Sequence, residues 1–183
     1  MIDELLGEAK AKMDQAVDHV SGEFATVRTG RANAAILQRV SVDYYGAQTP
    51  LQQLASVAVP EAQLLVVQPY DKTAIGDIEK AIQASGLGLN PANDGQVIRL
   101  AFPPLTEERR RELIKVVRQM AEEGRVAVRN VRRHTKDDIE ALAGDVSEDD
   151  IRGGEVELQE ITDRHTARID SLLEHKETEL LEV

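Results

Sequence analysis

A row of basic side chains in the second half of the chain has the spacing needed to follow successive phosphates. On a helix, eight of these side chains would lie within about 60° of one line; they are Arg111, Lys115, Arg118, Arg125, Arg129, Arg132, Arg133 and Lys136. The helix from Arg111 to Lys136 would be about 37 Å long, enough to reach several phosphates of a nucleic acid. This row, called the basic stripe below, therefore predicts a site for a nucleic-acid backbone.

The basic charge is concentrated in one part of an acidic chain. The 183 residues carry a formal net charge of −11, so the average field repels polyanions. Residues 107–136 nevertheless hold ten Lys or Arg and five acids, whereas residues 137–183 hold four and sixteen. An alternative stays open, because an exposed helix face is often only solvated and stabilised by ion pairs one turn apart. The acids available for such pairs are Glu107, Glu108, Glu112, Glu122 and Glu123.

The few aromatic residues narrow the type of nucleic acid. Only Phe24, Tyr44, Tyr45, Tyr70 and Phe102 are present, and none alternates with the arginines. Without aromatic side chains there is no platform on which single-stranded bases could stack. A stiff, arginine-rich helix is instead suited to structured RNA, in which shape and phosphate positions are recognised.

The residues that could form a catalytic or metal site are scattered. Gly86-Leu87-Gly88 lacks the lysine of a phosphate-binding loop, and the four histidines include no pair at helical spacing. His165 is expected on the inner side of its helix as a core residue. The chain has no cysteine for a disulfide or a thiolate. We therefore expect no catalytic residue, no metal, no cofactor and no small-molecule substrate.

Three long amphipathic helices are predicted, over residues 2–29, 106–142 and 147–180. Ser147 and Asp150 have the spacing of a capping box, whereas Gly153 and Gly154 predict a frayed start to the third helix. In the middle helix, an apolar seam beside Gly124 is expected directly behind the basic stripe; it comprises Leu113, Val117, Met120, Ala127, Val131 and Leu142. Such helices bury their seams by packing together, which predicts an elongated antiparallel bundle.

Between the first two helices the period changes to that of strands. Runs at 40–45, 54–59 and 64–67 are β-rich, residues 73–85 are helical, and 87–102 have the pattern of a hairpin. We therefore predict an α+β fold, with a three-helix bundle from residues 1–30 and 105–183 and an inserted β/α/β domain from 31–104. Because the chain crosses between the two at one place, we expect a hinge there; its residues are Gly30, Arg31, Pro103, Pro104 and Leu105.

The sequence contains no sign of membrane insertion or export. No run approaches the eighteen apolar residues of a membrane span, and charged residues interrupt every apolar cluster near the N-terminus. The lack of cysteine fits a reducing compartment. We expect a cytoplasmic protein without a membrane partner.

Five segments of the chain form a specific combination: Arg28-Thr29-Gly30-Arg31-Ala32; Val42-Asp43-Tyr44-Tyr45-Gly46 with Thr49-Pro50-Leu51; Leu87-Gly88-Leu89-Asn90-Pro91; Pro103-Pro104-Leu105-Thr106-Glu107-Glu108-Arg109-Arg110; and Val126-Ala127-Val128-Arg129-Asn130-Val131-Arg132-Arg133. Together they closely resemble the bacterial ribosome recycling factor family over essentially the whole chain. The resemblance implies an L-shaped monomer of roughly transfer-RNA dimensions, with a hinged β-rich domain. The chain departs from the family around Ala143-Gly144-Asp145, where many members are rich in lysine.

The resemblance also implies a function. Members of this family bind the post-termination ribosome on large-subunit ribosomal RNA (rRNA). With elongation factor G, which hydrolyses GTP and pushes on the small domain, they release the ribosome from messenger RNA and split it into subunits. Arg28, Arg129, Arg132 and Arg133 match the family's RNA-contacting residues, with Arg132 foremost, and Arg118 and Arg125 join them from the basic stripe. Gly30, Arg31, Pro103 and Pro104 match the family's hinge.

Two other functions remain open from the residues alone. The chain could be a coiled-coil adaptor whose apolar seams face a protein partner, which predicts binding that tolerates salt. It could also be an enzyme that uses the inserted domain, although no set of residues supports this.

Overall fold

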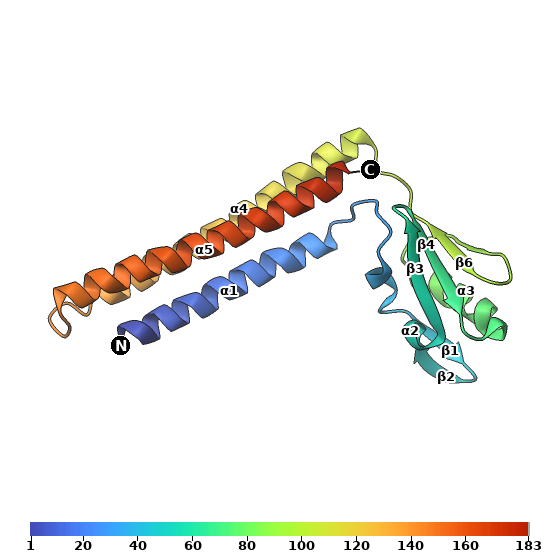
Figure 1. Ribbon diagram of the computed structural model, residues 1–183, viewed down its shortest axis with the longest axis horizontal. Helices are drawn as coiled ribbons and strands as arrows, with labels where there is room; N and C mark the ends of the chain where they lie inside the picture. The colour runs from blue at the N-terminus through green and yellow to red at the C-terminus, as the bar shows by residue number, and fades with distance from the viewer. Residues whose placement is uncertain (183) are drawn as a thin grey trace. The chain divides into compact units, whose positions relative to one another are not determined.

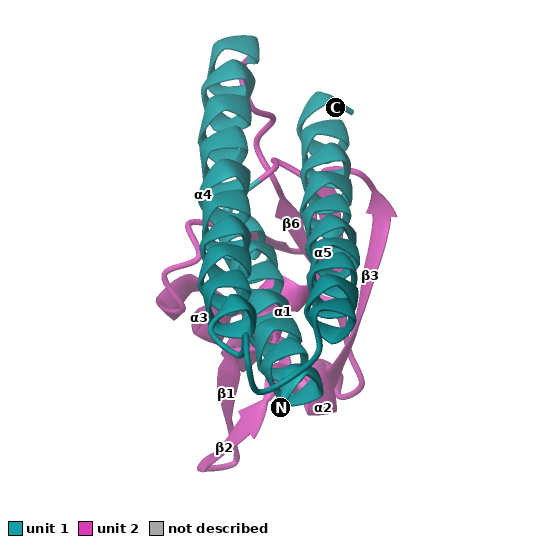
Figure 2. Cartoon of the chain, turned by 90° about the vertical axis from the view of Figure 1, so that its left-hand side faces the viewer, with its two compact units in different colours: residues 1–28, 107–182 teal, residues 29–106, 183 magenta. Residues whose placement is uncertain are grey.

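The chain folds into two units, which this computed structural model describes over residues 1–182 (Figures 1 and 2). The first unit contains residues 1–28 and 107–182, and the second contains residues 29–106. Helices α1 (Ile2–Thr26), α4 (Glu107–Glu140) and α5 (Glu148–Leu181) make up the first unit. The α+β class is confirmed. The inserted unit begins two residues before, and ends two residues after, the expected range of 31–104.

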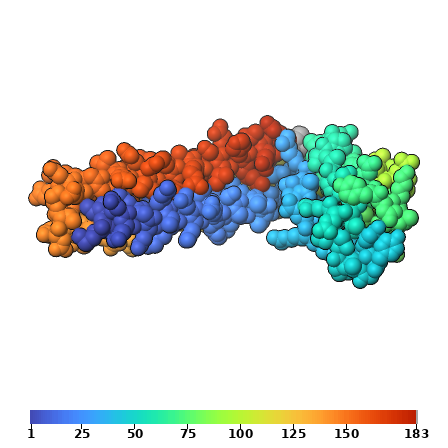
Figure 3. All heavy atoms as spheres, turned by 60° about the horizontal axis from the view of Figure 1, so that its bottom comes forward, coloured from blue at the N-terminus to red at the C-terminus, as the bar shows by residue number. Residues whose placement is uncertain are grey.

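The three helices of the first unit pack along their whole length, and Figure 3 shows α1 and α5 side by side on one face. A Cβ atom on Gly154 would lie 2.8 Å from Cγ2 of Ile2, and one on Gly124 would overlap Val20. These close approaches set α1 antiparallel to α4, and α4 antiparallel to α5. Gly154 is thus a packing contact in a continuous α5, so the predicted fraying at this position is wrong.

The buried face of α4 differs from the expected seam. Ala127 is exposed, and the residues that are buried are Val117, Ala121, Gly124, Val128, Thr135 and Ile139. The centre of this face is turned by about 50° from the seam predicted by the larger apolar side chains. Small residues lie at the centre of the buried face because they let α1 and α5 approach closely. The basic side chains consequently lie about 100° from the buried centre, beside the helix contacts and not opposite them.

The ends of the helices follow local capping chemistry. Ser147 Oγ accepts a hydrogen bond from the backbone N of Asp150 at 3.1 Å, which confirms the predicted cap of α5. Helix α1 ends at Thr26 and Val27 is extended, so Gly30 lies beyond the end of this helix. The positive φ of Gly30, 76°, occurs instead in the connecting segment of the second unit.

The second unit contains a four-stranded antiparallel sheet in the order β3-β4-β6-β5. Its strands are β3 (Ala55–Glu61), β4 (Leu64–Pro69), β5 (Pro91–Asn93) and β6 (Ile98–Ala101). A separate hairpin joins β1 (Ser41–Tyr44) to β2 (Ala47–Pro50), and α2 (Leu51–Leu54) follows it directly. The hairpin predicted over 87–102 is present, but its first strand begins at Pro91 and not at residue 87.

Helix α3 (Ile75–Ala84) contacts β1 and β5 and closes the core of the second unit. Two short 3-10 turns, η1 (Ala34–Leu37) and η2 (Lys72–Ala74), precede β1 and α3. The core side chains include Leu37, Val42, Leu51, Leu65, Val67, Ile78, Ile82, Ile98 and Leu100. The unit therefore has its own apolar core, separate from that of the helices.

Candidate nucleic-acid interface

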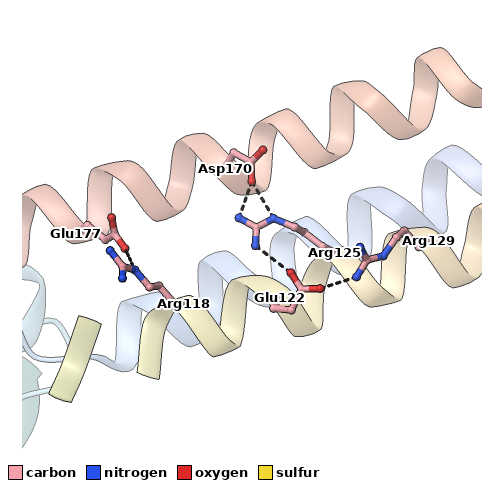
Figure 4. A network of polar contacts seen from close by, with 6 residues as sticks. All are labelled: Arg118, Glu122, Arg125, Arg129, Asp170 and Glu177. Atoms are coloured by element: carbon pink, nitrogen blue, oxygen red, sulfur yellow. Dashed lines mark hydrogen bonds and ion pairs between the residues drawn. The ribbon is translucent and has the colours of Figure 1, made fainter. Parts of the chain in front are cut away.

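Two arginines of the basic stripe, Arg118 and Arg125, connect α4 to α5 by hydrogen bonds (Figure 4). Arg118 Nε donates to Glu177 Oε1 at 2.5 Å, and Arg125 Nε and Nη2 donate to Asp170 Oδ1 at 2.8 and 2.6 Å. Both arginines and both acids are seven residues apart, so the pairs repeat every two turns along the antiparallel helices. These arginines lie at the edge of the helix contact because the buried face is turned toward them.

Glu122 joins Arg125 to Arg129, the next arginine of the basic stripe (Figure 4). Its Oε1 accepts from Arg129 Nη2 at 2.5 Å, and its Oε2 accepts from Arg125 Nη1 at 3.2 Å. The hydrogen bonds from Arg129 and then Arg125 lower the pKa of the Glu122 carboxyl, so it stays ionised at neutral pH. Two arginines and two carboxylates, including Asp170, thus form a locally neutral group.

Arg132 and Arg133 differ from the other arginines of the basic stripe, because neither forms an ion pair or hydrogen bond within residues 1–182. Arg132 continues the seven-residue series of Arg118 and Arg125, and Asp163 continues the opposing acidic series on α5. Asp163 Oδ1 instead accepts from Gln159 Nε2 at 2.7 Å. Two adjacent guanidinium groups are therefore left with their donors available to a phosphate.

The basic stripe is consequently not one uniform cationic face. Arg111 pairs with Glu107, and Lys136 lies 3.3 Å from Glu140 and 3.7 Å from Glu155. Glu140 in particular raises the pKa of Lys136. In the described chain, only Lys115, Arg132 and Arg133 of the eight stripe residues have no such partner. The alternative of ion pairs one turn apart is thus correct for Arg111, Arg125 and Lys136, whereas Arg118 and Arg129 pair with more distant acids.

Arg28 lies apart from the end of α4 that carries Arg132. Because Val20 packs on Gly124 and the helices are antiparallel, Arg28 is level with the first third of α4. Along the helix axis this is about 24 Å from Arg132. The structure therefore groups Arg118, Arg125, Arg129, Arg132 and Arg133 on one helix and places Arg28 near its start.

The expected hinge residues lie side by side in two connecting segments. A Cβ on Gly30 would lie 3.2 Å from Leu105 Cγ and 3.7 Å from the carbonyl oxygen of Pro103. Beyond them, the backbone N of Ala32 donates to Ala62 O at 2.7 Å, and that of Phe102 donates to Gln63 O at 2.8 Å. Both segments are thus fixed to the turn between β3 and β4.

The sequence indicated Glu107 and Glu122 among the possible partners of the arginines, but it did not indicate the partners on α5. Glu122 is three residues from Arg125 and seven from Arg129, a helical spacing that the sequence does contain. Asp170 and Glu177 could be found only by matching the seven-residue spacing of two distant helices. That match depends on the register of α4 against α5, which the glycine contacts set.

His165 is a satisfied core residue, as expected, and it belongs to a polar cluster. Its Nδ1 lies 2.6 Å from Ile161 O, its Nε2 lies 3.0 Å from Asp14 Oδ1, and Arg168 also donates to Asp14. Arg168 and then His165 lower the pKa of the Asp14 carboxyl. The cluster thus links α1 to α5 and has a structural role.

Among residues 1–182 there is no group of three or more His, Cys, Asp or Glu side chains placed to hold a metal ion. None of the helices in this range is both long and apolar enough to cross a bilayer.

Comparisons with known proteins give a consistent result. The family model described as ribosome recycling factor matches residues 20–181. A ribosome-recycling factor of Bacillus cereus (strain AH187) is 59% identical over 182 residues, and one of Bacillus mycoides is 58% identical; each alignment covers 98% of both chains. A solution structure of a ribosome recycling factor has 43% identity and a TM-score of 0.79, covering 100% of this chain and 98% of that one.

A second solved structure shows a similar chain in its assembly. It contains models of the Thermus thermophilus ribosome recycling factor and the Escherichia coli elongation factor G bound to the E. coli post-termination complex. That factor is 47% identical to this chain, with a TM-score of 0.64 and 99% of each chain covered.

Proposed function

Because this chain belongs to the ribosome recycling factor family, we propose that it acts after termination, on the post-termination ribosome and together with elongation factor G. GTP hydrolysis by that partner supplies the driving force for splitting the subunits and releasing the messenger RNA. The factor itself carries out no catalytic step and needs no cofactor or metal. It works in the cytoplasm as a monomer, without a membrane or small-molecule partner.

The observation that carries the docking step is the pair of uncommitted guanidinium groups at Arg132 and Arg133. Each can give two parallel N–H donors to a phosphate of large-subunit rRNA, and the released counterions favour binding. Arg129 lies one turn away and joins them when its carboxylate partner is displaced. Arg118 and Arg125 keep their ion pairs with α5 in this proposal, and Arg28 lies near the start of α4, so these three flank the contact without adding a phosphate to it.

The two connecting segments serve as the hinge in this proposal. Gly30 and Arg31 on one side, and Pro103, Pro104 and Leu105 on the other, separate the helices from the first anchored positions at Ala32 and Phe102. Only a few residues on each strand of the connection must change conformation when elongation factor G pushes on the second unit. The β-rich unit then moves as a rigid body, because it has its own apolar core.

The coiled-coil adaptor is disfavoured by the packing of the helices. Buried apolar side chains of α1, α4 and α5 already fill one shared core, including Met13, Val128 and Ile169. The seams that an adaptor would offer to a partner are therefore occupied within the chain.

Sedimentation of post-termination ribosomes tests the proposal directly. Ribosomes stalled after termination are mixed with this protein, elongation factor G and GTP, and free subunits are scored. We expect subunit release that requires all three additions and is weakened in the Arg132→Ala protein. Equal release with and without the protein would refute the function.

A further inference from the structure

Glu122 is the only acid that bridges two arginines of α4 within residues 1–182, and one of these, Arg129, lies about one turn from the uncommitted pair. We propose that Glu122 competes with RNA phosphates for Arg129 and thereby determines which RNA this face binds. The inference rests on the proposed function, because it assumes that Arg132 and Arg133 dock on RNA. It adds an acidic residue that selects among RNA surfaces.

The two arginines held by Glu122 depend on it to different degrees. Arg125 keeps two further hydrogen bonds, both to Asp170, and only 23% of its side chain is exposed. Arg129 has Glu122 as its one ion-pair partner in the described chain, and 58% of its side chain is exposed. Loss of the Glu122 carboxylate would therefore release Arg129 and leave Arg125 bound to α5.

Position makes Arg129 the natural third phosphate ligand. It precedes Arg132 by three residues and Arg133 by four, which places it on the same face about one turn, or 5 Å, along the helix. A chain of phosphates that reaches Arg132 and Arg133 must pass close to Arg129. There the phosphates meet the Glu122 carboxylate, which repels them as long as it is paired with Arg129.

Exposure allows the exchange of one anion for another. The side chains of Glu122 and Arg129 are 53% and 58% exposed, and ion pairs with that much solvent are weak. A phosphate held at the right place by RNA shape can displace the carboxylate, whereas a loosely placed phosphate cannot. Glu122 thus acts as a repulsive element that disfavours generic polyanions, because selectivity depends on the difference between two affinities.

Glu123 offers a matched control for the charge change. It is adjacent on α4 and exposed, and its Oε1 accepts from Gln119 Nε2 at 3.2 Å and not from an arginine. Glu122→Gln and Glu123→Gln change the net charge equally, but only the first frees an arginine.

Binding is measured for two probes, purified bacterial large ribosomal subunits and a short RNA duplex of generic sequence, over a range of salt concentrations. On the duplex, we expect Glu122→Gln to tighten binding about two- to fivefold. The slope of log affinity against log salt should steepen by about 0.9, the value for one added phosphate contact. Large subunits should gain less, because their placed phosphates already displace Glu122. Glu123→Gln should leave both slopes unchanged, and adding Arg129→Ala to Glu122→Gln should restore the parent slope.

The possible results separate the inference from the proposed function. An equal gain for Glu122→Gln and Glu123→Gln, or a gain that persists without Arg129, would overturn the inference in favour of a net-charge effect. Loss of binding in Arg132→Ala without any gain in Glu122→Gln refutes the role of Glu122 but leaves docking intact. If Arg132→Ala binds large subunits like the parent, the docking face itself is wrong. Circular dichroism establishes that each variant is folded.

Discussion

The salt dependence of ribosome binding should report how many arginines of α4 contact phosphates. Each neutralised phosphate contributes about −0.9 to the slope of log affinity against log salt. If Arg132 and Arg133 contact phosphates and Arg129 joins them, the slope should be about −3, whereas six engaged arginines would give about −5. The ion pairs of Arg118 and Arg125 with α5 favour the smaller value.

Replacing Arg132 with Ala should make the slope less steep by about 0.9 and weaken binding by roughly 1 to 3 kcal/mol. Replacing Arg118 with Ala is the matched control, because it removes the same charge from the same helix. Arg118 is held by Glu177, so this change should leave the slope nearly unaltered. The chain has no cysteine, and one introduced at the exposed Ser56 would carry a dye for equilibrium binding to large subunits.

A parent slope near −5, with equal losses for Arg118→Ala and Arg132→Ala, would refute the reasoning. It would mean that the cross-helix pairs break on binding and that the free structure does not identify the docking residues. A slope near −3 that Arg132→Ala does not change would refute the assignment of Arg132 itself.

Gly124→Ala should destabilise the bundle by about 1 to 3 kcal/mol in urea unfolding, since the added Cβ has no space. Gly153→Ala, where a Cβ meets nothing within 4 Å, should instead raise the free energy of unfolding by about 0.5 to 1 kcal/mol. Backbone N–H groups lower the pKa of Asp94 to about 2, so its stabilisation is full above about pH 4 and is lost as the pH falls toward 2. Asp94→Asn should remove that acid dependence from unfolding curves. Gln159→Ala frees an α5 carboxylate for Arg132, and binding to large subunits should weaken.

The helices and their caps could be predicted from the sequence because their signals are local. The apolar spacing located α1, α4 and α5 to within a few residues, and Ser147 identified the start of α5. The rotation of α4 was predicted wrongly. A helical wheel weights large apolar side chains, whereas close packing of three helices favours the small ones, Ala121 and Gly124.

The state of the arginines could not be read from α4 alone. The sequence places Arg118, Arg125 and Arg132 at equivalent positions, seven residues apart, and predicts the same role for each. The structure gives them different environments because their partners come from α5, 45 to 59 residues away in the chain. That pairing requires the register between helices, which no local pattern contains.

Helix α5 therefore determines which arginine of α4 is free to bind RNA. Glu177 and Asp170 occupy two of the three equivalent positions opposite α4, and both hold an arginine. At the third position Asp163 is present with the same charge, but Gln159 donates to it. The neutral side-chain amide of Gln159, one turn away on α5, thus takes the place of Arg132 as the donor to Asp163. The same repeat thus stabilises the bundle at two positions and leaves a guanidinium available at the third, so that fold stability and docking use different members of one series.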